Sequence, residues 1–317
     1  MNLLLPEVNK MANLIRIGTR ESQLAVWQAT EVKKLLAQNG FASELVYIKS
    51  EGDLDLKTPL YEMGVQGVFT RSLDSALLND KIDIAVHSMK DVPTQLPKRI
   101  IQAAILKRAS YKDLLVYKND TSFLNDFNSS AVIATSSIRR KAQWLNRYPN
   151  SKVENLRGNV NTRLRKVEEN NWNGAIFAAA GLERIDLRPE NSIELDWMLP
   201  APAQGAIMVV CRADDTHSLN ACTHFNDSNT VLCTKIERDF LRTLLGGCST
   251  PISALAEIKN KEVHFKGNIL SVDGKEKVEF EMTCSNLKAE DLGVKAAKQL
   301  LQTGGQSIAD SIRNAGK

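Results

Sequence analysis

The sequence predicts an α/β protein with parallel sheets over its first two thirds and a smaller α+β domain at its C-terminal end. In the first part, short apolar and β-branched runs alternate with segments of helical periodicity, an order typical of parallel sheets with helices on both faces. After Asp227, one helical segment is followed by three apolar runs and a last helix, which indicates an antiparallel sheet packed on helices. A length of 317 residues allows two or three domains.

The expected elements of the first part follow from local patterns. Ser22 and Gly40 are good boundary residues for a helix over Ser22–Asn39. Further helices are expected over Phe69–Leu78 and Ser137–Arg147. Buried strands are predicted at Leu14–Ile17, Leu45–Ile48, Ile82–Val86, Val132–Ala134, Val153–Asn155, Ala175–Ala178 and Ile207–Val210.

The C-terminal part begins with a helix in which Ile236, Phe240 and Leu244 recur every four residues, so one of its faces belongs to the core. Asp273-Gly274 is a hairpin turn signal between two predicted strands. The strands are predicted at Leu255–Ile258, Val263–Leu270 and Val278–Thr283, and the last helix at Lys288–Leu301.

Composition excludes several classes of protein. The chain is 43% hydrophobic and 25% charged, as ordinary globular proteins are, and no apolar run approaches the ~20 residues of a membrane span. Its five cysteines form no CxxC pair and no metal-ligand spacing with the four histidines, so we expect reduced thiols, a cytoplasmic location and no metal. We expect the ordered domain to start near Met11, with Met1–Lys10 as an extension or a wrongly assigned start.

Polar side chains are concentrated just after predicted strands, where open α/β sheets bind their ligands. They are Arg20 and Ser22, the run from His87 to Asp91, the run from Ser136 to Arg140, Arg157 and Arg184.

An excess of positive charge lies between Ala131 and Lys166, where nine basic residues accompany one acid, although the net charge of the chain is only +4. Arg139 and Arg140 follow a good N-cap sequence, so each would stand in a first helical turn, where the helix dipole disfavours a cation by ~0.3–1 kcal/mol. We therefore expect them to bind a carboxylate or phosphate rather than support the fold, so that a change to Gln would not lower thermal stability. A solvated basic face is the alternative, and a nucleic-acid site is disfavoured because no aromatic residues interleave the arginines.

The segment His87-Ser-Met-Lys-Asp-Val-Pro93 places Lys90 and Asp91 side by side at a strand end. Val92-Pro93 bars helical continuation and is expected to hold Asp91 in a loop, where it could bind ligand N–H groups and stabilise a developing cation. The alternative without a catalytic role is that Asp91 forms a surface ion pair with Lys90 or caps a helix. His87 is interpreted as a structural residue at the strand end.

Two glycine-rich segments are further candidates. Glu51–Phe69 is a long polar loop, either a lid or a loop without function. Gly246 and Gly247 can close a helix and leave room beside Cys248, the next residue. A helix C-terminus does not favour a thiolate, which argues against a redox cysteine and for a sulfur that is alkylated once. A small apolar core cysteine is the alternative.

These motifs together resemble the hydroxymethylbilane synthase family, also called porphobilinogen deaminase, from about Leu14 to Ile312. The resemblance rests on Arg16-Ile-Gly-Thr-Arg-Glu-Ser22, Asp83-Ile-Ala-Val-His-Ser-Met-Lys-Asp-Val-Pro93, Thr135-Ser-Ser-Ile-Arg-Arg140, Leu156-Arg-Gly-Asn159, Ala180-Gly-Leu182, Gln204-Gly-Ala206 and the seventeen residues from Glu237 to Ser253 around Cys248.

The resemblance implies an enzyme that joins four porphobilinogen units head to tail, releases ammonia and frees a linear tetrapyrrole. It implies a dipyrromethane cofactor bound to Cys248 through a thioether, and a catalytic role for Asp91 in stabilising the azafulvenium cation formed as ammonia departs. It assigns Phe69 and Gln204 to the cleft. It also implies that acetate and propionate side chains bind to Arg20, Ser22, Lys90, Arg139, Arg140, Arg157, Arg163 and Arg184.

The resemblance further implies a monomer of three domains, at about 1–107 with 205–225, 108–204 and 226–317. The first two would be doubly wound and similar to periplasmic binding proteins, so the main alternative is a non-enzymatic binder of an acidic small molecule. The sequence departs from the family at Gln66, where a lid lysine is usual, at Arg71-Ser-Leu-Asp74, and at Ala203, where glycine is usual.

Overall fold

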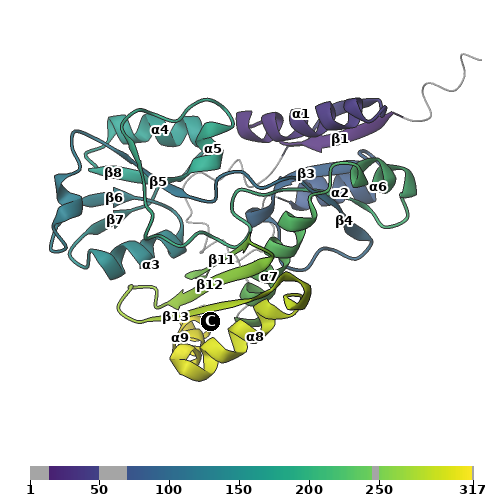
Figure 1. Ribbon diagram of the computed structural model, residues 1–317. Coiled ribbons are helices and arrows are strands. Elements are labelled where there is room, and N and C mark those ends of the chain that lie inside the picture. The colour runs from purple at the N-terminus through teal and green to yellow at the C-terminus, as the bar shows by residue number, and fades with distance from the viewer. Residues whose placement is uncertain (1–13, 50–69, 245–249, 316–317) are drawn as a thin grey trace, which may run out of the picture.

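The computed structural model describes residues 14–49, 70–244 and 250–315, whose strands form three sheets (Figure 1). Two five-stranded sheets lie side by side in the upper half of the view, and a three-stranded sheet lies below them. In this described part, no helix is both long and apolar enough to cross a bilayer.

The first sheet has the strand order β2-β1-β3-β10-β4. Its strands are β1 (Ile15–Thr19), β2 (Ser43–Tyr47), β3 (Ile84–Ser88), β4 (Ile100–Ile105) and β10 (Ile207–Arg212). β1 runs parallel to β2 and β3, as expected, but β10 runs antiparallel to both β3 and β4. The expectation of a purely parallel sheet is therefore wrong.

The antiparallel direction of β10 follows from the path of the chain. β4 ends at Ile105, and the chain then builds the second sheet before it returns as β10 at Ile207. Because the last residue of β4, Ile105, pairs with Met208 near the start of β10, the chain returns at the strand end where it left, inserts between β3 and β4, and must run antiparallel to β4. The second sheet, ordered β7-β6-β8-β5-β9, is mixed as well, since β5 runs antiparallel to β8 and β9. Its strands are β5 (Asp113–Tyr117), β6 (Val132–Ala134), β7 (Lys152–Glu154), β8 (Gly174–Ala178) and β9 (Ser192–Glu194).

Helices cover both faces of each five-stranded sheet, which confirms the doubly wound arrangement. On the first sheet, α1 (Gln23–Gln38) and α6 (Thr216–Thr223) share one apolar cluster, and α2 (Arg71–Leu78) packs in another. On the second sheet, α4 (Val160–Glu169) and α5 (Ala179–Glu183) pack in one cluster and α3 (Ile138–Arg147) in the other.

The third sheet is antiparallel, as predicted, with β11 (Ile252–Lys259), β12 (Glu262–Leu270) and β13 (Lys277–Ser285) in that order. Side chains of α7 (Ser228–Leu244), α8 (Leu292–Leu300) and α9 (Gln306–Ala315) pack on it in one apolar core. The helix expected from Lys288 begins only at Leu292, and α9 was not anticipated. Short helical segments complete the structure at η3 (Met89–Asp91), η4 (Ser122–Asn125), η5 (Asn286–Lys288) and η6 (Leu301–Gly305).

The predicted turn at Gly274 connects β12 and β13 and reaches across to α3. Asn146 donates a hydrogen bond from Nδ2 to the carbonyl oxygen of Gly274 at 2.7 Å. Gly274 has φ +76°, and a Cβ added there would lie 2.5 Å from the carbonyl oxygen of Ala142. Only glycine fits this turn, which ties the third sheet to the helix that carries Arg139 and Arg140.

Candidate active site

Asp91 ends a single 3-10 turn that follows β3 directly. The side chains of Met89 and Val92 are each 2% exposed, while Asp91 itself is exposed. Val92 is extended, with φ −85° and ψ 129°, as the following Pro93 requires. The expected loop is thus a short helical turn that Val92-Pro93 ends, with the carboxylate on its solvent side.

Positive groups from both five-stranded sheets lie around this turn. Burial lowers the pKa of Lys90 to about 8, an effect that Asp91 opposes and the charge of Arg140 reinforces. Burial also lowers the pKa of Arg163 on α4 to about 10, again with Arg140 reinforcing and Asp91 opposing. The structure therefore brings Asp91 into the electrostatic field of basic residues that lie 49 to 72 positions further along the chain.

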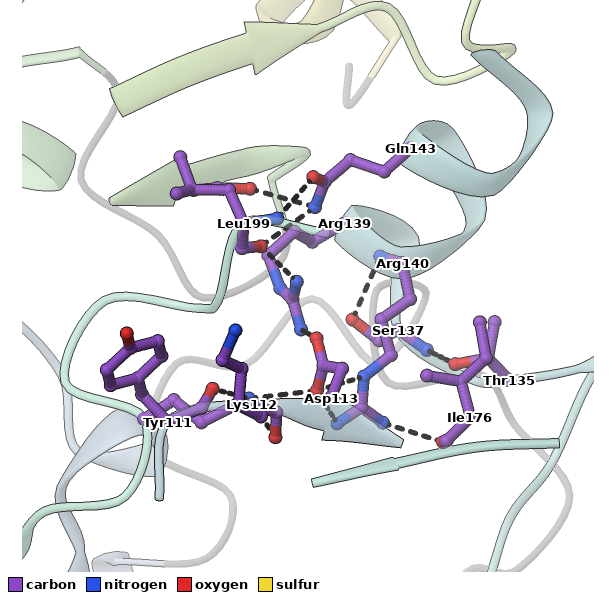
Figure 2. Close-up of polar contacts among 12 residues, drawn as sticks. Tyr111, Lys112, Asp113, Thr135, Ser137, Arg139, Arg140, Gln143, Ile176 and Leu199 are labelled. Atoms are coloured by element: carbon purple, nitrogen blue, oxygen red, sulfur yellow. Dashed lines mark hydrogen bonds and ion pairs between the residues drawn. The ribbon is translucent and has the colours of Figure 1, made fainter. Parts of the chain in front are cut away.

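Asp113, the first residue of β5, is fully buried and faces the side chains of Arg139 and Arg140 (Figure 2). Its Oδ2 accepts a hydrogen bond from Arg139 at 2.7 Å. Its Oδ1 accepts two from Arg140, at 3.1 and 2.7 Å, and one from the side-chain amide of Gln204 at 2.8 Å. Burial raises the pKa of Asp113, but the charges of Arg139 and Arg140 outweigh it and hold that pKa below its ordinary value of 3.8.

This cluster corrects the sequence-based view of the two arginines. Ser137 does cap α3, accepting the Arg140 N–H at 3.4 Å, so both arginines stand in the first turn as predicted. Their side chains are only 5% and 7% exposed, however, and both pair with Asp113. The expectation that they do not support the fold is wrong, because a buried carboxylate outweighs the unfavourable helix dipole.

Sequence reasoning missed Asp113. The available signal was a lone acidic residue immediately before the apolar run Leu114–Val116 of β5. An acid at the end of a buried strand needs a partner, and the arginine-rich segment was the nearest large source of positive charge.

The two arginines differ in what their remaining donors do. Arg140 gives its third hydrogen bond to the carbonyl oxygen of Ile176 at 2.9 Å. Arg139 gives one to the carbonyl oxygen of Leu199 at 2.6 Å, and its buried Nε has no hydrogen-bond partner among the described residues. Arg139 also lines a small cavity that includes Lys90 and Thr250. Arg139 is therefore the better placed of the two to bind a ligand.

A second small cavity lies on the other side of Lys90 and is lined by Ser88, Arg184 and Gly205 among others. Arg184 donates a hydrogen bond to the carbonyl oxygen of Gly205 at 2.7 Å and stacks over Trp27, 5.7 Å from the ring centre. Burial lowers the pKa of Arg184 to about 10. Lys90 thus lines both cavities, which together extend the polar site from α5 to the start of β11.

The other predicted residues divide into two groups. Arg20 is half-buried after β1 and lies near His87, whose pKa falls to about 4 because of burial and the charge of Arg20. Arg157 is buried, and its charge acts on Arg163. Ser22 and Gln204 have structural partners instead: Ser22 caps α1 through the Ala25 N–H at 3.4 Å, and the Gln204 amide bonds Asp113.

The candidate segments Glu51–Phe69 and Gly246–Cys248 lie outside the described residues, and with them three individual candidates. These three are Cys248, Phe69 and the departure at Gln66. Among the described residues, the arrangement is one exposed carboxylate, Asp91, faced by several desolvated cations. Such a site can bind a small molecule with several carboxylates, while the exposed carboxylate of Asp91 can stabilise a positive charge on it.

Comparison with known proteins gives matches along the chain. A family model described as "Porphobilinogen deaminase, dipyromethane cofactor binding domain" matches residues 15–220, and one described as "Porphobilinogen deaminase, C-terminal domain" matches residues 231–302. A porphobilinogen deaminase of Syntrophomonas wolfei is 41% identical over 307 residues, covering 96% of this chain and 100% of its own. One of Chlorobium phaeobacteroides is 37% identical over 311 residues, covering 96% and 99%. An ancestral cationic amino acid solute binding protein has a similar structure, with a TM-score of 0.45 and 15% identity over 68% of this chain and 89% of its own.

Proposed function

The chain belongs to the porphobilinogen deaminase family, and we propose that its polar site performs the family reaction through Asp91, with Cys248 as the covalent anchor. The protein is a transferase that polymerises porphobilinogen in tetrapyrrole biosynthesis. Four units are joined head to tail to give the linear tetrapyrrole hydroxymethylbilane, with ammonia released from each unit. The observation that carries the assignment of Asp91 is that its carboxylate is exposed and near enough to Lys90 and Arg163 for its charge to raise their pKa values.

Asp91 would act on the step in which ammonia leaves. The substrate's aminomethyl group reacts as its ammonium form: the bond between carbon and the protonated nitrogen breaks, and ammonia leaves with the electron pair. Positive charge then spreads over the substrate's pyrrole ring, whose N–H becomes a stronger donor. A fixed carboxylate binds that charged state more strongly than the neutral ring, which is the condition for a higher turnover rate.

The basic residues would hold the substrate's acetate and propionate groups. Guanidinium groups pair with carboxylates in a bidentate way and so orient the rings as well as neutralise them. Arg139 fits this role because it lines the cavity, and its buried Nε has no hydrogen-bond partner among the described residues. We assign the carboxylate-binding role to Arg20, Lys90, Arg139, Arg140, Arg157, Arg163 and Arg184. Ser22 and Gln204 would act mainly by supporting the cleft.

The same residues fit the dipyrromethane cofactor that the family model names, since it carries the same side-chain carboxylates as the substrate. When bound, that group supplies the fixed starting point on which the chain of pyrroles grows. The four described cysteines are poorly suited to attachment, because three of them are buried and burial makes each thiol harder to ionise. Burial raises the thiol pKa of Cys211 to about 11 and those of Cys222 and Cys233 to about 12, and it raises that of Cys284 as well. This supports Cys248 as the attachment residue.

Mass spectrometry tests the anchor. The intact mass of the denatured protein should exceed the sequence mass by two linked pyrrole units, and peptide mapping should place the excess on the Cys248 peptide. Cys248→Ser should fold but carry neither the adduct nor the activity. An adduct on one of the four other cysteines, or fully active protein without one, would move the anchor elsewhere.

We also propose the domain division of 1–107 with 205–225, 108–204 and 226–317, and a cytoplasmic monomer that binds neither nucleic acid nor membrane. The division follows the three sheets, because β5 to β9 fall between the two crossovers at residues 106–112 and 195–206. The alternative of a non-enzymatic binder is not favoured, because the family models cover both the cleft and the C-terminal domain.

A further inference from the structure

Arg238 extends from α7 to the turn that carries Asp91. Its guanidinium donates hydrogen bonds to the carbonyl oxygen of Val92 at 2.9 Å and to that of Pro93 at 2.6 Å. A longer contact of 3.4 Å reaches the carbonyl oxygen of Met89. A single planar cation thus binds carbonyl groups on both sides of Asp91, and such charge-assisted bonds are stronger than neutral ones.

The turn is held from its other side by packing. The buried side chains of Met89 and Val92 belong to the apolar core of the first sheet. The Met89 N–H donates to the carbonyl oxygen of Ala206 at 3.0 Å, and the Val92 N–H donates back to Met89 at 3.1 Å. Asp91 lies between these two anchored residues, and its own side chain is exposed. The backbone of the turn therefore sets the direction in which its carboxylate points.

The part of α7 that carries Arg238 is held in place by the preceding residue, Glu237, which makes several buried hydrogen bonds. The Glu237 carboxylate is fully buried and accepts two hydrogen bonds from Arg108, at 2.6 and 3.1 Å. It also accepts the backbone N–H of Ala203 at 2.6 Å and that of Ala256 at 2.8 Å. These bonds join α7 to both crossover segments and to β11, so α7 cannot shift easily relative to the turn.

We infer that Arg238 is a positioning residue for Asp91: it fixes the carbonyl groups of the turn and thereby the direction of the carboxylate. This inference rests on the proposed catalytic role of Asp91. A carboxylate displaced by about 1 Å can lose up to ~10²-fold in rate, because stabilisation of a developing charge depends on fixed geometry. Substrate binding should change much less, since the substrate's carboxylates are held by other residues.

The experiment compares Arg238→Gln with Arg242→Gln on the full-length enzyme. Arg242 lies one turn further along α7, is 48% exposed and pairs with Asp239 at 2.8 Å, so its variant makes the same chemical change without touching the turn. After intact mass confirms cofactor loading in both, Arg238→Gln should lower kcat at least about tenfold relative to the control, with KM within about threefold. Arg238→Lys keeps the charge and should recover part of kcat.

A double-mutant cycle shows whether the effect passes through Asp91. If it does, Arg238→Gln should cost little when Asp91 is already Asn, so the two losses should be far from additive. Additive losses would show that Arg238 acts elsewhere. If Asp91→Asn alone keeps near-parental turnover, the proposed function of Asp91 fails. If Asp91→Asn is slow but Arg238→Gln matches Arg242→Gln, only the positioning inference fails.

Hydrogen exchange gives a readout without turnover. In cofactor-free protein with Cys248→Ser, Arg238→Gln should speed exchange of the Val92 amide, whose bond to Met89 closes the turn, and Arg242→Gln should not. Unchanged exchange with an equal fall in melting temperature for both variants would identify Arg238 as a general structural contact and overturn the inference.

Discussion

Arg140 donates two hydrogen bonds to Oδ1 of Asp113, at 3.1 Å from Nε and 2.7 Å from a terminal nitrogen, where both side chains are buried (Figure 2). This pair connects the first turn of α3 to the first residue of β5 and so shapes the floor of the site. Arg140 therefore has a structural role in addition to the carboxylate binding proposed for it.

Asp113→Asn should lower the free energy of unfolding at pH 7 by about 3–5 kcal/mol, because it leaves two buried guanidinium groups without their counter-charge. Asp196→Asn is the matched control: Asp196 is 75% exposed and pairs with Lys112, so its loss should cost less than about 1 kcal/mol. Urea denaturation measures both. Equal, small losses would contradict the structural role of Asp113.

The Asp113 contribution should also depend on pH in a definite direction. Because its folded-state pKa lies below 3.8, the carboxylate stabilises the fold fully above about pH 4, and that stabilisation is lost as the pH falls further. The difference in unfolding free energy between the parent and Asp113→Asn should therefore shrink on acidification below about pH 4. A difference that stays constant to pH 2 would argue against the ion pair.

Arg140→Gln should destabilise the protein more than Arg139→Gln, since Arg140 gives two bonds to Asp113 and one to Ile176. Arg139→Gln should instead show the larger loss of cofactor loading, because Arg139 lines the cavity that also includes Lys90. Urea denaturation and intact mass separate the two effects, with exposed Arg165→Gln as control. The reverse order in both measurements would refute this division of roles.

Asp91→Asn should reduce the single-turnover rate of porphobilinogen consumption by about 10²–10³, since it keeps the size and one acceptor oxygen but removes the charge. Asp91→Glu keeps the charge and displaces it by about one methylene, so it should retain more activity. Both variants are compared only after mass spectrometry shows cofactor loading. Turnover of loaded Asp91→Asn within a few-fold of the parent would reduce Asp91 to a structural cap.

The KM for porphobilinogen should rise above about pH 8, where burial causes Lys90 to lose its charge. A bound carboxylate favours the charged lysine, so binding is tighter below that pH and weakens above it. Lys90→Arg has no pKa in this range and should give a flatter profile. Ionisation of the substrate affects the parent and Lys90→Arg equally, so it drops out when their KM–pH profiles are compared. Identical profiles for the two proteins would exclude Lys90 as the cause of the rise in KM.

The sequence by itself determined the local structure. Ser22 and Ser137 cap helices where their side chains predicted it, and Val92-Pro93 ends the Asp91 turn as the ring of proline requires. These features depend on a residue and its neighbours within one or two turns, so local patterns contain them. Three strands of the five-stranded sheets were missed: β4 has a mixed pattern and β9 is only three residues at a sheet edge, whereas the apolar run of β5 was a signal that the prediction did not use.

Only the tertiary structure decided the direction of β10 and the partners of the buried charges. Asp113 meets Arg139 and Arg140 across 26 and 27 positions and Gln204 across 91, and Arg238 reaches Pro93 across 145. Local propensity acts over a few residues, whereas the pairing of a buried charge depends on which chain segments pack against it. Packing therefore decided which of the residues proposed for the site also hold the fold.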